Sequence, residues 1–178
     1  QRVNTIVRDL QQFARGDIDT QCEFDLNAEI AAAARISSNQ LKGRARLALS
    51  LGELPPLHGK PRQLTQVMVN LIVNAAHAVA ERPAGSISVT SRCDVNRVVV
   101  EVRDNGCGMS RDVMARMFQP FFTTKTVGQG TGLGLSVAYG IIRDHDGQIT
   151  VDSEIGKGTC IRVELPVRAA DEQVARAA

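Results

Sequence analysis

The sequence lacks several features that would define a function class at once. It has no tryptophan and one tyrosine, and its four cysteines form no CxxC pair. Neither a zinc site nor a disulfide framework is therefore predicted, and reduced thiols are typical of a cytoplasmic domain. No apolar run is long enough to span a membrane, and the N-terminus does not resemble a signal peptide. The net charge of +2 without a basic block argues against a nucleic-acid partner, and we expect no direct membrane contact from this chain.

The residues that are present are sufficient for one folded domain with a hydrophobic core, since the chain has 178 residues of which 43% are hydrophobic. Alternating apolar positions predict strands at 21–26, 44–52, 85–93 and 96–104, and a hairpin at 148–167 that turns at Gly-Lys-Gly. Helical periodicity predicts helices at 28–43, capped by Asn27, and at 60–82, 110–118 and 132–147, with a loop at 53–59. We predict an α+β fold, a two-layer sandwich of one mixed, largely antiparallel sheet with helices on one face.

The two ends of the chain differ from this central part. Residues 1–16 carry an apolar stripe at three- and four-residue spacing and begin without an N-cap, which suggests the end of a longer helix. A surface helix packed on the same domain is the alternative. We predict a linker at 17–20, the main domain at 21–167 and a frayed tail at 168–178.

A glycine-rich loop precedes the last predicted helix, with Gly128, Gly130, Gly132 and Gly134 at every second position. Its spacing does not match the dinucleotide motif GxGxxG, and the P-loop motif with its Gly-Lys-Ser/Thr is absent. Protein-kinase motifs such as HRD and DFG are absent as well. The loop leads into a helix whose first amides attract an anion, so we predict a phosphate site, with a flexible hinge as the alternative.

A carboxylate ends one predicted strand, where Asp104 is followed by Gly106 and Gly108. Such a carboxylate accepts a hydrogen bond from the exocyclic amine of adenine and repels the carbonyl of guanine. The glycines would let a flat base approach the backbone. The alternative is a hairpin turn of the Asp-Asn-Gly type, although a helix is predicted to follow instead of a strand.

Two asparagines interrupt the apolar face of the helix at 60–82. Asn70 and Asn74 are four residues apart, so they share one face, and His77 lies near it. Amide oxygens suit a hard cation such as Mg²⁺, whereas a mutually satisfied polar pair in the core is the alternative. Three phenylalanines between residues 118 and 122 precede the glycine loop, which indicates either a lid or a local hydrophobic anchor.

Five motifs in fixed order resemble the N, G1, F, G2 and G3 boxes of the ATP-binding domain of bacterial sensor histidine kinases. They read QVMVNLIVNAAHAV, DNGCGM, MFQPFFTTK, GQGTGLGLSVAYG and GKGTCIRVELP. The closest similarity is to kinases of the nitrogen-regulator and dicarboxylate-sensor type. The resemblance covers roughly 21–167 and implies the Bergerat-type fold shared with DNA gyrase B, the Hsp90 chaperones and MutL.

The resemblance also implies roles for individual residues. Asn74 would be the main Mg²⁺ ligand with Asn70 supporting it, and Lys125 would join these two as a catalytic residue. His77 departs from the lysine or glutamine with which many relatives touch phosphate, so its role stays open. The implied ATP-binding residues are Asn74, His77, Asp104, Gly106, Gly108, Met109, Arg116, Thr124, Lys125, Gly130, Thr131, Gly132, Leu133, Gly134, Leu135 and Thr159.

The implied activity is a protein-histidine kinase that uses ATP and Mg²⁺. The phosphate acceptor would be a histidine of the kinase's own dimerisation domain, within a homodimer, with relay to a response-regulator receiver domain. Residues 1–16 resemble the end of the second dimerisation helix, and none of His58, His77 and His145 has the expected His-Glu setting. A clamp-type ATPase, an anti-sigma type serine kinase and a non-catalytic nucleotide sensor are the alternatives.

Overall fold

The computed structural model describes residues 20–125 and 130–167. The predicted helix at 1–16, most of the predicted linker, Gly128 and the tail at 168–178 lie outside the described residues. Four helices longer than one turn are described, α2 (Leu26–Leu41), α3 (Pro61–Ala78), α4 (Arg111–Arg116) and α5 (Gly134–Asp144). The strands are β1 (Cys22–Phe24), β2 (Arg46–Leu51), β3 (Leu57–Gly59), β4 (Ser86–Asp94), β5 (Arg97–Asp104), β6 (Gln148–Glu154) and β7 (Gly158–Pro166).

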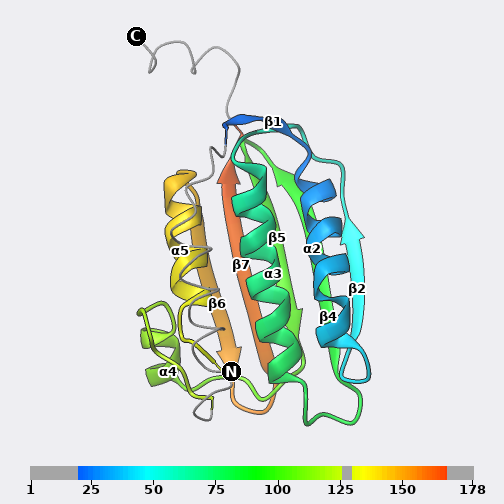
Figure 1. The fold of residues 1–178 in the computed structure, drawn as a ribbon, viewed down its shortest axis with the longest axis vertical. Coiled ribbons are helices and arrows are strands. Elements are labelled where there is room, and N and C mark those ends of the chain that lie inside the picture. Colours follow the sequence, from blue (N-terminus) through cyan, green and yellow to red (C-terminus); the bar gives the residue numbers. More distant parts are fainter. Residues whose placement is uncertain (1–19, 126–129, 168–178) are drawn as a thin grey trace.

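Five strands form one mixed sheet in the order β2-β4-β5-β7-β6. β2 runs parallel to β4, and the other three pairings are antiparallel. Helices α2, α3 and α5 lie side by side over one face of this sheet (Figure 1). The predicted α+β sandwich is confirmed. None of the helices within 20–125 and 130–167 has the length and apolarity needed to cross a membrane.

The core lies between the helices and the sheet, and α3 is its central element. All seven residues predicted for its inner face are buried, namely Leu64, Val67, Met68, Leu71, Ile72, Ala75 and Val79. Because complete burial of an aliphatic side chain contributes about 1.5–3 kcal/mol, this helix is firmly fixed to the sheet. The polar residues on the same helix are therefore held in defined positions.

Three local predictions were wrong in detail. The cap of α2 is Asp25, whose carboxylate accepts from the Asn27 amide at 2.8 Å. Asn27 lies inside the first turn, where its side chain reaches sideways and donates to the Gly52 carbonyl. The predicted loop at 53–59 contains β3, which becomes a strand only through its pairing with distant β1. α3 ends at Ala78, earlier than the proline at 83 suggested.

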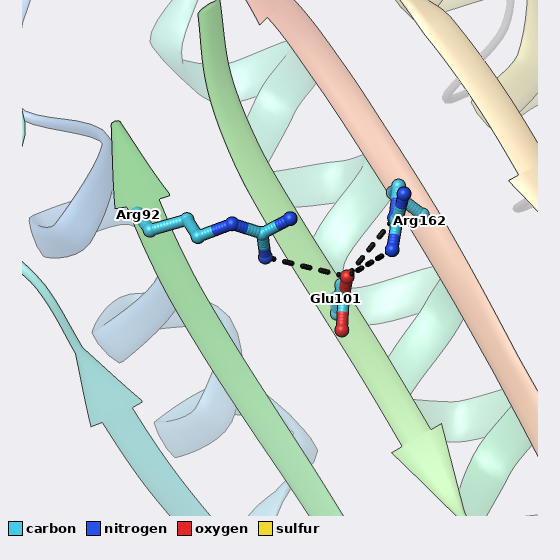
Figure 2. Close-up of polar contacts among 3 residues, drawn as sticks. All are labelled: Arg92, Glu101 and Arg162. Carbon is cyan, nitrogen blue, oxygen red and sulfur yellow. Dashed lines mark hydrogen bonds and ion pairs between the residues drawn. The ribbon is translucent and has the colours of Figure 1, made fainter. Parts of the chain in front are cut away.

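The sheet face away from the helices carries charged side chains. Figure 2 shows Glu101 on β5 between Arg92 of β4 and Arg162 of β7, and one carboxylate oxygen accepts from both arginines at 3.3 and 2.9 Å. Burial raises the pKa of Glu101, but the hydrogen bonds from the two arginines outweigh it and hold that pKa below its usual range. These cross-strand pairs favour one strand register.

Candidate functional site

Predicted site residues from α3, β5, α5 and β7 converge at one end of the sandwich. There the C-terminal ends of α3 and β5 meet the beginnings of α5 and β7, at the lower end of the molecule in Figure 1. α3 contributes Asn70, Asn74 and His77, and β5 contributes Asp104. The topology thus unites motifs that are far apart in the sequence.

Asp104 is the last residue of β5 and points toward the helical layer. Only 8% of it is exposed, and its Oδ1 accepts a hydrogen bond from the Gly106 amide at 2.8 Å. Burial raises the pKa of Asp104, and hydrogen bonds from the backbone of Gly106 and Thr159 act in the opposite direction. A buried carboxylate with unused acceptor capacity suits a ligand that donates an N–H.

Thr159 lies directly opposite Asp104 in the pairing of β5 with β7. Its hydroxyl is 3.0 Å from the hydroxyl of Ser153, which also accepts from the Met109 amide at 2.9 Å. Ser153 therefore joins three segments at the site, and the sequence prediction had missed it. The signal was its position on β6 opposite Thr159, which only the register of the hairpin reveals.

Gly106 and Gly108 make room for protein backbone. A Cβ at Gly106 would lie 2.5 Å from the Ala78 carbonyl oxygen at the end of α3. A Cβ at Gly108 would lie 2.0 Å from the Glu154 carbonyl oxygen, and this residue has φ +68°. The two glycines thus fix the loop after Asp104 against α3 and against the β6–β7 hairpin. That they also admit a base stays a prediction.

The start of α5 is held by α3 but has no side-chain cap. Asn70 donates from Nδ2 to the Gly134 carbonyl at 3.0 Å. The N-terminal cap residue, Leu133, provides no side-chain hydrogen bond, so the first amides of α5 stay available to an anion. Just before it, the hydroxyl of Thr131 accepts from the Leu133 amide at 3.4 Å. The side chain of Leu135 packs against the core.

Lys125 connects the segment before the glycine loop to α3. Its ammonium donates to Asn74 Oδ1 at 3.1 Å and to His77 Nδ1 at 2.8 Å. Burial lowers the pKa of Lys125. Burial also lowers the pKa of His77, and the positive charges of Lys125 and Arg44 lower it further. Because an ammonium only donates, Nδ1 of His77 is its unprotonated nitrogen.

Two other predicted lid residues are not brought to this cluster. The Arg116 guanidinium lies over the Phe122 ring, 4.5 Å from its centroid. Thr124 is exposed. Gly132 has φ +69°, and its carbonyl accepts from the Phe121 amide at 3.0 Å, while Gly130 lies against Lys125. The described residues of the segment between α4 and α5 thus contact one another as well as α3.

Comparisons with known proteins identify this arrangement. Residues 59–169 match the family model described as histidine kinase-, DNA gyrase B- and HSP90-like ATPase. The chain belongs to this ATPase family. It is also 31% identical to the catalytic domain of histidine kinase ThkA, with a TM-score of 0.73, covering 83% of this chain and 96% of that one. The domain is therefore an ATPase domain of the histidine-kinase type.

The chain is also similar to longer sensor proteins. The chain is 37% identical over 163 residues to a putative sensor protein of Shewanella frigidimarina, covering 91% of this chain and 25% of that protein. It is 35% identical over 168 residues to sensor histidine kinase ZraS of Escherichia coli, covering 93% of this chain and 35% of that protein. A structure of ThkA in complex with response regulator protein TrrA has 25% identity and a TM-score of 0.73 over 94% of this chain and 48% of the other. The chain thus spans about a quarter to a third of these two sensor proteins.

This ATPase domain has a hollow along its strands. This hollow of about 440 Å³ is lined by residues of β2, β4, β5, β6 and β7, including Arg46 and Arg103. Asp104 and Thr159 border it, but no residue of α3 or of the segment between α4 and α5 does. The motifs on α3 and at the start of α5 therefore lie apart from this hollow, in the helical layer.

Proposed function

We infer that this domain binds MgATP and transfers the γ-phosphate to a histidine on the dimerisation and phosphoacceptor domain of its kinase. The phosphate would then pass to an aspartate of a response-regulator receiver domain. The observation that carries this proposal is the convergence of Asp104, Asn74 and the uncapped start of α5 at one end of the sandwich. We propose that the full kinase is a homodimer and that this domain lies in the cytoplasm.

The proposed binding mode assigns opposite ends of ATP to opposite parts of the site. Asp104 would accept from the adenine amine, with Thr159 and Met109 beside it. The phosphates would meet the amides from Gly130 to Leu135, where the dipole of α5 favours negative charge. Lys125, Arg116 and Thr124 would reach the γ-phosphate from the lid.

The residues on α3 fit a divalent cation. Asn74 Oδ1 already accepts from a cation, the Lys125 ammonium, so this oxygen points toward positive charge. Asn70 uses its Nδ2 for the Gly134 carbonyl, which leaves its amide oxygen for a supporting role. Magnesium prefers oxygen ligands shared with phosphates, and when bound it would neutralise phosphate charge.

The chemistry of the site favours transfer over hydrolysis. The resemblance puts a water-activating glutamate of the clamp-type ATPases at the position of Asn70, and an amide is no general base at neutral pH. The protein's part is then to hold the triphosphate in line with an incoming imidazole and to balance its charge. Slow ATP turnover by the domain alone follows from this arrangement.

The test follows γ-labelled ATP with Mg²⁺. ADP release and protein labelling are measured for this chain alone and with a histidine-containing helical hairpin of a related kinase. We expect slow ADP release alone and a labelled hairpin histidine in the mixture. Rapid ADP release without labelling would instead support a clamp-type ATPase.

Two variants make the assay specific. Asn74→Ala should abolish Mg²⁺-dependent transfer and leave the folded state intact, as judged by circular dichroism. Asn39→Ala removes an exposed asparagine from α2 and should leave transfer unchanged. Undiminished transfer in the Asn74 variant would remove the metal assignment.

A further inference from the structure

His77 lies one turn beyond Asn74 on α3, and the lid-side lysine contacts both. The Lys125 ammonium is 2.8 Å from His77 Nδ1 and 3.1 Å from Asn74 Oδ1. Two acceptors on one rigid helix therefore fix a cation that is 48 and 51 residues away in sequence.

The two acceptors differ in what they can do when nucleotide binds. Asn74 Oδ1 is the oxygen that we assign to the metal, and a metal ligand cannot also keep a hydrogen bond from an ammonium on the same face. His77 has no such competing role, and its Nδ1 is an acceptor because the Lys125 ammonium that faces it at 2.8 Å only donates. After metal coordination through Asn74, His77 is the acceptor that remains.

The geometry points to His77 as a positioning residue that holds Lys125 through Nδ1, rather than as a phosphate ligand. In this arrangement the Lys125 ammonium keeps one hydrogen bond to α3 and turns its other protons toward the triphosphate. His77 thus acts on the reaction only through Lys125. The inference rests on the proposed nucleotide site, and it explains why a histidine occupies this position of α3.

The first test is spectroscopic and requires no nucleotide. Nitrogen NMR on the histidine-labelled chain reports the protonation and hydrogen bonding of all three rings, His58, His77 and His145. We expect His77 as the Nε2–H form with a hydrogen-bonded Nδ1. In Lys125→Met only the His77 Nδ1 signal should move, toward the value of an unbonded ring nitrogen. An unmoved signal would overturn the contact itself.

The second test is a double-mutant cycle on the affinity for a non-hydrolysable ATP analogue with Mg²⁺, measured by calorimetry. His77→Leu should weaken binding by about tenfold or more, the loss expected for one hydrogen bond to a charged donor. In the Lys125→Met background, His77→Leu should have no further effect. An equal loss in both backgrounds would show that His77 touches the nucleotide directly and would refute the inference.

Conservative variants complete the design. His77→Asn places an amide oxygen near the position of Nδ1 and should restore most of the affinity, whereas His77→Gln extends its oxygen toward the position of Nε2 and should not. His58→Leu is the matched control on β3. If the wild-type chain binds no nucleotide, the proposed function fails, and the NMR result still decides whether His77 holds Lys125.

Discussion

Replacing Gly108 by alanine places a methyl group where the structure has protein backbone. This residue has φ +68°, and the new Cβ would lie 2.0 Å from the Glu154 carbonyl oxygen. The left-handed conformation costs a non-glycine residue about 1–2 kcal/mol, and overpacking costs about 1–3 kcal/mol. We therefore expect Gly108→Ala to lower the free energy of unfolding by about 2–5 kcal/mol.

Two other glycines separate these contributions. Gly43 has φ +74° but no heavy atom within 4 Å of the place that a methyl group would occupy, so Gly43→Ala should show only the conformational cost, about 1–2 kcal/mol. Gly140 lies within α5, also with nothing within 4 Å, and Gly140→Ala should stabilise the domain by up to about 1 kcal/mol. All three variants lose the same flexibility in the unfolded chain, so their differences report the folded state.

Urea unfolding followed by circular dichroism measures the series. With a slope of about 2 kcal/mol per molar, Gly108→Ala should lower the midpoint by about 1–2.5 M, and Gly43→Ala by about 0.5–1 M. Equal shifts for these two variants would refute the reasoning, because they would show that the loop at Gly108 moves away from Glu154 without cost. Nucleotide affinity should fall in the Gly108 variant, since the same loop follows Asp104.

Three further predictions concern charged and polar side chains. Burial raises the pKa of Asp104, so its ionised form costs stability above the folded pKa. Asp104→Asn should raise the melting temperature at pH 7, and this gain should disappear as the pH is lowered to the pKa of the aspartate in the unfolded chain. In competition binding, the same variant should lose the preference for ATP over GTP. Because the pKa of Glu101 is lowered in the folded state, its contribution to stability is lost as the pH falls through that folded pKa. The ion pairs lie at the surface, so Glu101→Gln should lower the free energy of unfolding by at most about 1 kcal/mol at pH 7. Thermal melts should show a smaller loss in high salt. His145 accepts from the Lys60 amide at 3.1 Å, and His145→Ala should cost about 1–3 kcal/mol in urea unfolding.

Much of the fold follows from local patterns in the sequence. The seven residues predicted for the buried face of α3 are all buried because they recur at helical spacing, and the prediction missed the buried Ala76. Strands β4 and β6 follow from the alternation of buried and more exposed residues along them, whereas β5 and β7 each contain a run of buried residues. Local patterns failed at Asn27 and at β3, where the partner lies elsewhere in the chain.

The candidate site was predictable as a set of residues but not as a set of contacts. Asn70 and Asn74 share a helix face by their spacing alone, yet Asn70 holds the start of α5 through the Gly134 carbonyl. Gly106 was predicted from its place after a strand, but its close neighbour proves to be the end of α3. Arg116 stays a predicted phosphate contact, and no sequence pattern indicated that its guanidinium lies over the Phe122 ring.

The sequence by itself determined the kind of site, because the order of the motifs and the chemistry of their residues can be read directly from it. Only the tertiary structure decided which groups meet, and Lys125 is the clearest case. Its partners on α3 are 48 and 51 residues away, and no periodicity links such positions. Packing of α3 and α5 on one sheet face brings them together, since each helix must bury its own apolar face there.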